Sequence, residues 1–285
     1  MGDLPLAVAQ AAGYLPGSGM SAEAYLKVLR TRAAKTLDLG KPVSYSRSLA
    51  AATQLSFDQL AGEDFAAAQL INLCAFMAPE PIAQDLFTTA VEQLPEPLAA
   101  RAADPLAWPQ VVAQLATRSL ARVDQHGLQL HRLTQAILRD CLTPAHTIVT
   151  RECAEAILAA SNPGDPDNPA GWPRWARLVP HVLAADLVAA GHDGLRQLAC
   201  EACHYLMARG DTRIAYELAS DLRQQWRDRL GEDHEHALEI TRCLAWALVA
   251  KGSYAEARDL DQDILDRRRR IWARTTATPC FPRLS

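Results

Sequence analysis

Aromatic residues are scarce in this sequence: they make up 6% of its 285 residues, whereas hydrophobic residues as a whole make up 49%. The apolar mass is therefore mainly alanine, leucine and valine, which suit the packing of helix against helix. A chain of this length is also expected to form two or three packed units, because single cores stop growing near this size. We expect a mostly α fold.

The chain lacks a strong net charge and a long apolar run. Lys and Arg number 29 against 33 Asp and Glu, a net charge of −4 that gives no overall attraction to nucleic acid or to an anionic membrane. No run approaches the roughly 20 apolar residues of a membrane span. The seven cysteines are odd in number and scattered, which favours reduced thiols and a cytoplasmic location.

Sequence motifs for catalysis and for cofactor binding are also missing. There is no phosphate-binding loop G-x-x-x-x-G-K-[ST], no G-x-S-x-G elbow and no H-E-x-x-H pair. The string Cys200 to His204 matches a c-type haem attachment site, but it lies within a continuous helical pattern, so we interpret its cysteines as core residues. We therefore expect no enzyme activity, no metal and no cofactor bound by this chain alone.

Helical periodicity predicts helices over Ala22–Leu37, 63–77 and 82–94, with a break at Lys41-Pro42. Residues 108–141 then show another pattern: a helix, the segment LARV, a turn at DQHG, the segment LQLH and a second helix. A helix, a hairpin and a helix in this order are typical of a winged helix, with the hairpin as its wing.

A winged helix raises the possibility of DNA binding through helix 108–118 or helix 132–141. The first offers only Arg118 near its end, and the second offers Arg132 and Arg139 beside an aspartate. These cations are too few for a surface that follows a phosphate backbone, so nucleic acid is not the expected partner.

A turn-rich loop at 161–171 marks a domain boundary, and an internal repeat follows it. MARGDTRIAYEL (207–218) aligns with VAKGSYAEARDL (249–260), which places Gly210 and Gly252 42 residues apart. A pair of short helices with glycine at the turn and alanine at the contact is typical of a helical-hairpin solenoid.

The repeat register breaks at Trp272. A segment ILGEDHRDAL would continue the repeat, and the loss of one nucleotide from its codons gives IWARTTATPC, which is the sequence of residues 271–280. We therefore predict that 272–285 is a frame-shifted tail and that the last hairpin has an uncovered apolar face.

Taken together, the order of GDLPLA, the helix-flanked hairpin, LHRLTQAILRD, the proline-rich loop and the LGEDH-type repeats resembles actinobacterial NB-ARC proteins (STAND NTPases) with tetratricopeptide arrays. In that family the proline of a GLPL-type motif packs on the nucleotide, which implies this role for Pro5. The histidine of an MHD-type motif lies near the β-phosphate of ADP and locks the closed state, which implies this role for His131. Arg132 stands where an aspartate is more familiar. On residues alone, Pro5 also fits a first helical turn and His131 a simple junction histidine.

The resemblance implies a C-terminal fragment without the phosphate-loop domain, so that ADP or ATP belongs to the intact family and not to this chain alone. The expected parts are a helical subdomain (1–45), a winged-helix domain (46–145), a helical linker (146–195), degenerate tetratricopeptide repeats (196–271) that bind a protein or peptide, and the tail (272–285). The alternatives are a stand-alone tetratricopeptide adaptor and a winged-helix transcriptional regulator.

Overall fold

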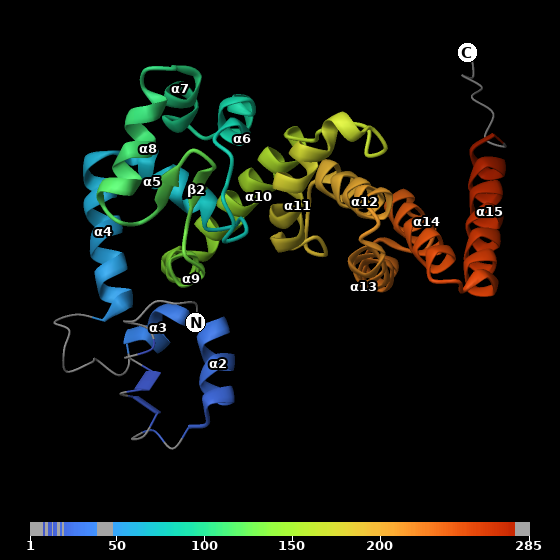
Figure 1. The fold of residues 1–285 in the computed structure, drawn as a ribbon, viewed down its shortest axis with the longest axis horizontal. Coiled ribbons are helices and arrows are strands. Elements are labelled where there is room, and N and C mark those ends of the chain that lie inside the picture. The colour runs from blue at the N-terminus through green and yellow to red at the C-terminus, as the bar shows by residue number, and fades with distance from the viewer. Residues whose placement is uncertain are drawn as a thin grey trace, which may run out of the picture. The chain divides into compact units, whose positions relative to one another are not determined.

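The computed structural model describes residues 8, 11, 12, 14, 15, 18, 20–38 and 48–276, which are mostly helical with one small antiparallel sheet (Figure 1). The predicted mostly α fold with a small β-hairpin is confirmed. By internal packing the chain divides into two units, Met1–Asn162 with Arg177–Ala185, and Pro163–Ala176 with Asp186–Ser285. Within the described ranges, no helix combines the length and the apolar character that crossing a membrane requires.

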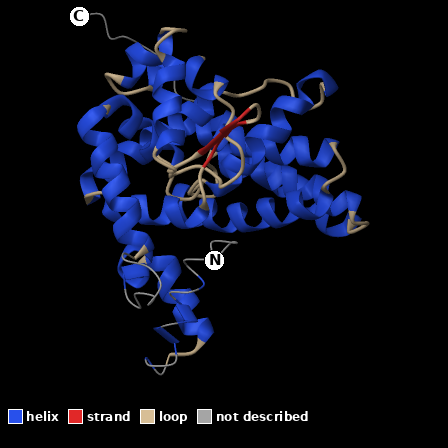
Figure 2. Cartoon of the chain, turned by 60° about the vertical axis from the view of Figure 1, so that its left-hand side comes forward, coloured by secondary structure: helices blue, strands red, loops and turns tan. Residues whose placement is uncertain are grey.

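The elements of the first unit are short helices around one hairpin, whose strands are red in Figure 2. They are α2 (Ala22–Thr31), α3 (Ala33–Asp38), α4 (Leu49–Glu63), α5 (Phe65–Cys74), α6 (Asp85–Thr88), the 3₁₀ turn η1 (Val91–Gln93), α7 (Leu98–Ala103), α8 (Trp108–Thr117), β1 (Arg122–Asp124), β2 (Gly127–Gln129), α9 (Arg132–Cys141) and α10 (Pro144–Ala160). The last part of α11 (Trp172–Ala184) also belongs to this unit.

Three of the predicted helices in this unit were wrong in extent. The helix expected over Ala22–Leu37 is divided into α2 and α3, since the backbone leaves the helical conformation at Arg32 (φ −148°, ψ 57°). The helix expected over 63–77 begins only at Phe65, because the Asp64 N–H closes α4 on the Leu60 carbonyl while its carboxylate accepts from the Ala67 N–H and caps α5. The helix expected over 82–94 is reduced to α6 and η1. There, Ile82 exchanges two backbone hydrogen bonds with Leu128, which holds Ile82 extended.

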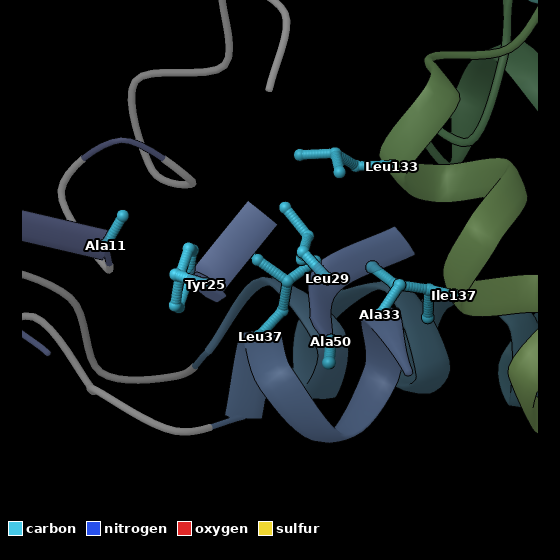
Figure 3. Packing of buried hydrophobic residues seen from close by; sticks show 8 residues of the cluster. All are labelled: Ala11, Tyr25, Leu29, Ala33, Leu37, Ala50, Leu133 and Ile137. Carbon is cyan, nitrogen blue, oxygen red and sulfur yellow. The ribbon is translucent and has the colours of Figure 1, made fainter. Parts of the chain in front are cut away.

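The N-terminal helices are joined to the rest of the unit by an apolar cluster (Figure 3). Its buried members come from α2, α3, the start of α4, one face of α9 and position 11, which precedes α2: Ala11, Tyr25, Leu29, Ala33, Leu37, Ala50, Leu133 and Ile137. Helix α9 therefore packs against the N-terminal helices with one face.

Another side of α9 closes the C-terminal end of α5. The buried Gln135 side chain donates its amide N–H groups to the carbonyl oxygens of Cys74 and Met77, both at 3.0 Å, and the Arg139 guanidinium donates to the Ala75 carbonyl. The last carbonyl groups of a helix have no partners inside the helix. Here Gln135 and Arg139 of α9 supply the missing hydrogen-bond donors.

The variant Gln135→Leu is expected to lower the free energy of unfolding of the first unit by about 2 kcal/mol, because it leaves buried carbonyl groups without donors. Hydrogen exchange in α5 peptides under increasing denaturant measures this loss. Gln110→Leu, at an exposed position of α8, is the matched control and should change stability by less than about 0.5 kcal/mol. Equal stability of the two variants would show that Gln135 does not close α5.

The second unit consists of the 3₁₀ turn η2 (Pro169–Gly171), the first part of α11 and four longer helices, α12 (Asp193–Ala208), α13 (Thr212–Leu230), α14 (Glu235–Ala250) and α15 (Tyr254–Thr276). Gly210 and Gly252 have positive φ angles of 89° and 83° at the turns that follow α12 and α14. The two aligned glycines thus have the same structural role, since such angles favour glycine.

Helix α15 extends to Thr276, five residues beyond the point at which the sequence lost its helical periodicity. The reason is local: residues 272–276 contain no proline or glycine, and an arginine-rich turn precedes them.

Candidate functional site

A cleft of about 840 Å³ lies in the first unit beside the hairpin. One face of α4 forms one side of it, with Leu49, Thr53 and Ser56 at helical spacing. The other sides are the loop residues 79–80, the stretch 118–122 from the end of α8 into β1, and residues around the junction of β2 and α9.

His131 lies in this cleft at the N-cap position of α9. Its backbone is extended (φ −67°, ψ 139°), and its Nδ1 atom accepts a hydrogen bond from the Leu133 N–H at 3.2 Å. Because Nδ1 is the acceptor, the proton of the neutral ring is on Nε2.

The charged side chains that line the cleft are mainly basic: Arg118, Arg122 and Arg132, with Glu80 as the acidic member. Arg118 reaches back to α4, where it donates to Gln59 at 3.2 Å and pairs with Glu63. Arg122 pairs with Asp124 at 3.2 Å. Together with the N-terminal end of α9, this set of groups favours an anionic ligand.

The loop that forms the wall at 79–80 is held by side chains from distant parts of the unit. Gln129 donates to the Pro79 carbonyl at 2.9 Å. The buried His181 ring accepts from the Ala78 N–H at 3.2 Å through Nδ1, and its Nε2 lies 3.3 Å from the Pro81 carbonyl oxygen. Burial lowers the pKa of His181 from 6.5 to about 4, and the Pro81 carbonyl offsets part of this shift.

Gly127 brings the hairpin against this loop. Its φ angle is +134°, and a Cβ atom at this position would lie 2.1 Å from the Ile82 carbonyl oxygen. Glycine is therefore required twice, for the backbone angle and for the close approach. The bridge between Ile82 and Leu128 fixes the start of the strand-to-helix junction that carries His131.

Of the two residues predicted for the site, His131 lies in the cleft and Pro5 lies outside the residues that the structure describes. Neither the position of Arg118 in the cleft nor the support of the cleft wall by His181 was predictable from the sequence. A second histidine in this chain has the same position at the start of a helix. His234 stands directly before α14 and caps it, with its Nδ1 atom accepting from the His236 N–H at 3.2 Å.

The haem-like string is a helix core, as expected. Cys200 and Cys203 are buried, and burial raises the pKa of the Cys200 thiol well above its usual value. His204 pairs with Asp167 at 3.2 Å. Thiols in such a position are inaccessible for attachment of a macrocycle. In the part of the chain that the structure describes, no group of three or more His, Cys, Asp or Glu residues has the geometry of a metal site.

Comparison with known protein families finds a match that includes most of the cleft but not Leu49, Ala52 and Thr53. Residues 56–147 match a domain of unknown function, DUF7779. The matched segment begins within α4, contains the whole hairpin and α9, and ends in the first turn of α10. No curated protein and no solved structure matches the chain. The domain that DUF7779 defines thus includes His131 and the arginines of the cleft.

Proposed function

We propose that this chain is the regulatory and partner-binding portion of a nucleotide-controlled signalling protein of the NB-ARC (STAND) type. In this proposal the hairpin and its flanking helices form a winged helix that closes over ADP held by a neighbouring phosphate-binding domain. The observation that carries the proposal is the position of His131, which caps α9 within a cleft lined by arginines.

The chemistry of the cleft supports this role. The Nε2 proton of a neutral His131 is a donor for a phosphate oxygen, and the N-terminal end of α9 adds a favourable field for negative charge. Arg132 and Arg122 are positioned to neutralise further phosphate charge, since both line the same cleft. The sequence has no phosphate-binding loop, so the phosphate groups come to His131 from another domain.

The same proposal assigns partner binding to the tetratricopeptide-like hairpins of the second unit, in the cytoplasm. Half-buried Trp246 lies beside the His204 ring, with 4.8 Å between the ring centroids, and the Arg242 guanidinium lies 4.6 Å from its centroid. An aromatic side chain with charged neighbours on paired helices is typical of protein-recognition surfaces. A protein or peptide is therefore the ligand proposed for this unit.

The test is an NMR titration of the full chain, labelled at its histidine rings and at its backbone amides, with pyrophosphate and then with ADP. We expect the His131 signals to shift with an affinity in the millimolar range, because this chain supplies only one side of the phosphate site. His131→Ala should abolish the response of the cleft residues. His126→Ala, in the exposed turn of the hairpin, is the matched control and should leave that response unchanged.

Two results would contradict the proposal. Submicromolar binding of ADP would mean that the chain has a complete nucleotide site. The absence of any His131 response to either anion would remove the basis for a phosphate contact. A salt-dependent mobility shift with random duplex DNA would instead favour a transcriptional regulator.

A further inference from the structure

Helix α15 has an exposed stripe along one side. We define it as Tyr254, Arg258, Asp261, Leu265, Arg268 and Trp272, whose spacings alternate between four and three residues and therefore follow one face of a helix. Its three apolar members are strongly exposed, Tyr254 at 68%, Leu265 at 49% and Trp272 at 72%. Large apolar side chains that share one face in this way mark an interaction surface.

The internal repeat indicates that this stripe packs against another helix. The equivalent positions of α13, 42 residues earlier, include Tyr216 and Trp226. Both contact α14 or the turn after it: Lys251 lies 3.5 Å from the Tyr216 ring centroid, and the Trp226 ring lies 6.2 Å from that of His236. Part of the stripe of α13 is thus covered by α14 and by the turn after it, whereas all six residues of the stripe of α15 are exposed. In stacked hairpins each unit covers the face of its neighbour.

The charges of α15 indicate the orientation of a covering helix. Residues 254–266 contain five acidic side chains and one arginine, whereas 267–270 are four consecutive arginines. Two copies of α15 in parallel would place like charges together, which is unfavourable. Two antiparallel copies would place the acidic half of each against the basic half of the other.

We propose that the stripe of α15 is covered by α15 of a second copy of this chain, antiparallel and with a two-fold axis near Leu265. A two-fold axis makes every contact occur twice. With the axis at Leu265, Asp261 faces Arg269 of the second copy, and Arg258 faces Trp272 of the second copy in a cation–π contact. This inference concerns the second unit and does not rest on the proposed function.

The test is the mass of the full chain in solution, measured by sedimentation equilibrium over a range of protein concentrations. The wild-type chain should show a monomer–dimer equilibrium that weakens with added salt, because opposite charges hold the orientation. Leu265→Glu places a charge on the two-fold axis and should raise the dissociation constant by about 10- to 100-fold. Leu106→Glu, at an exposed apolar position of the first unit, is the matched control and should dimerise like the wild type.

A charge exchange tests the orientation separately. Asp261→Arg and Arg269→Glu should each weaken the dimer by about tenfold, and the double variant should restore it, because the two reversed charges face each other across the axis. Asp261 and Arg269 are exposed, so folding should be preserved, and circular dichroism checks this. A chain that is monomeric at every concentration, or a dimer that Leu265→Glu does not weaken, overturns the proposal. Failure of the double variant to recover overturns the antiparallel arrangement.

Discussion

Replacing Gly127 with alanine is expected to separate the hairpin from the loop after α5 and to lower the free energy of unfolding of the first unit by about 3 kcal/mol. The added methyl group would lie 2.1 Å from the Ile82 carbonyl oxygen, and the φ angle of +134° is unfavourable for any residue with a Cβ atom. Either the two backbone hydrogen bonds between Ile82 and Leu128 are lost, or the loop that contains Ile82 moves. Hydrogen exchange at these two amides, with chemical denaturation of the chain, measures the effect.

The matched control is Gly62→Ala in helix α4, where a Cβ atom would meet nothing within 4 Å. Alanine has the higher helix propensity, so this variant should be neutral or more stable by up to about 1 kcal/mol. Because β2 leads directly into His131, Gly127→Ala should also weaken the response of His131 to pyrophosphate. If both glycine variants retain wild-type exchange at Ile82, the close approach does not hold the hairpin.

The strands of the hairpin were predictable from the local sequence, but the contact of the hairpin with the rest of the unit was not. The turn DQHG and the short apolar segments on either side predicted two strands, and the structure has β1 and β2 there, paired in register from Asp124 and Gly127 outward. The contact of Gly127 with Ile82 was not predictable, since it joins positions 45 residues apart that share no sequence pattern. The same contact made the expected helix over 82–94 wrong.

The roles of the polar side chains Gln135 and Arg118 were not predictable from the sequence for a similar reason. Gln135 lies on the side of α9 away from Leu133 and Ile137, where a polar residue is ordinarily exposed, and its role depends on carbonyl groups about 60 residues earlier in the chain. Arg118 was assigned to a helix end, but its partners Gln59 and Glu63 lie one turn apart on α4. Helical periodicity predicts which face is buried, but it does not identify the groups that meet across it.

His131 was found by a different route. Composition and periodicity describe it only as a histidine between a strand and a helix, and the resemblance of LHRLTQAILRD to a family motif supplied the hypothesis of a phosphate contact. The structure adds the physical content, which is an N-cap that assigns the ring proton to Nε2 within a basic cleft. The second unit needed no family motif, because the repeated segments 207–218 and 249–260, with Gly210 and Gly252 at their turns, aligned its two hairpins.

The first unit is expected to lose about 3 kcal/mol of stability as the pH falls from about 6.5 to about 4, through the protonation of His181. The pKa of this buried ring is lowered to about 4 in the folded chain, whereas the unfolded chain has the ordinary value of 6.5. Between these values the unfolded state binds more protons, so its free energy falls relative to the folded state as the pH decreases. Above pH 6.5 the neutral ring contributes its full stabilisation.

The measurement is the free energy of unfolding of the first unit at several pH values, by hydrogen exchange in α5 and hairpin peptides, for the wild type and for His181→Gln. The glutamine amide oxygen is an acceptor for the Ala78 N–H at every pH, so the variant should lose about 3 kcal/mol less than the wild type across this range. His126→Gln removes an exposed histidine and should retain the wild-type pH dependence. Parallel profiles for the wild type and His181→Gln would show that the ring is not held neutral. The loop that His181 holds also forms the wall of the cleft at Pro79, so the same acidification should weaken the response of His131 to pyrophosphate.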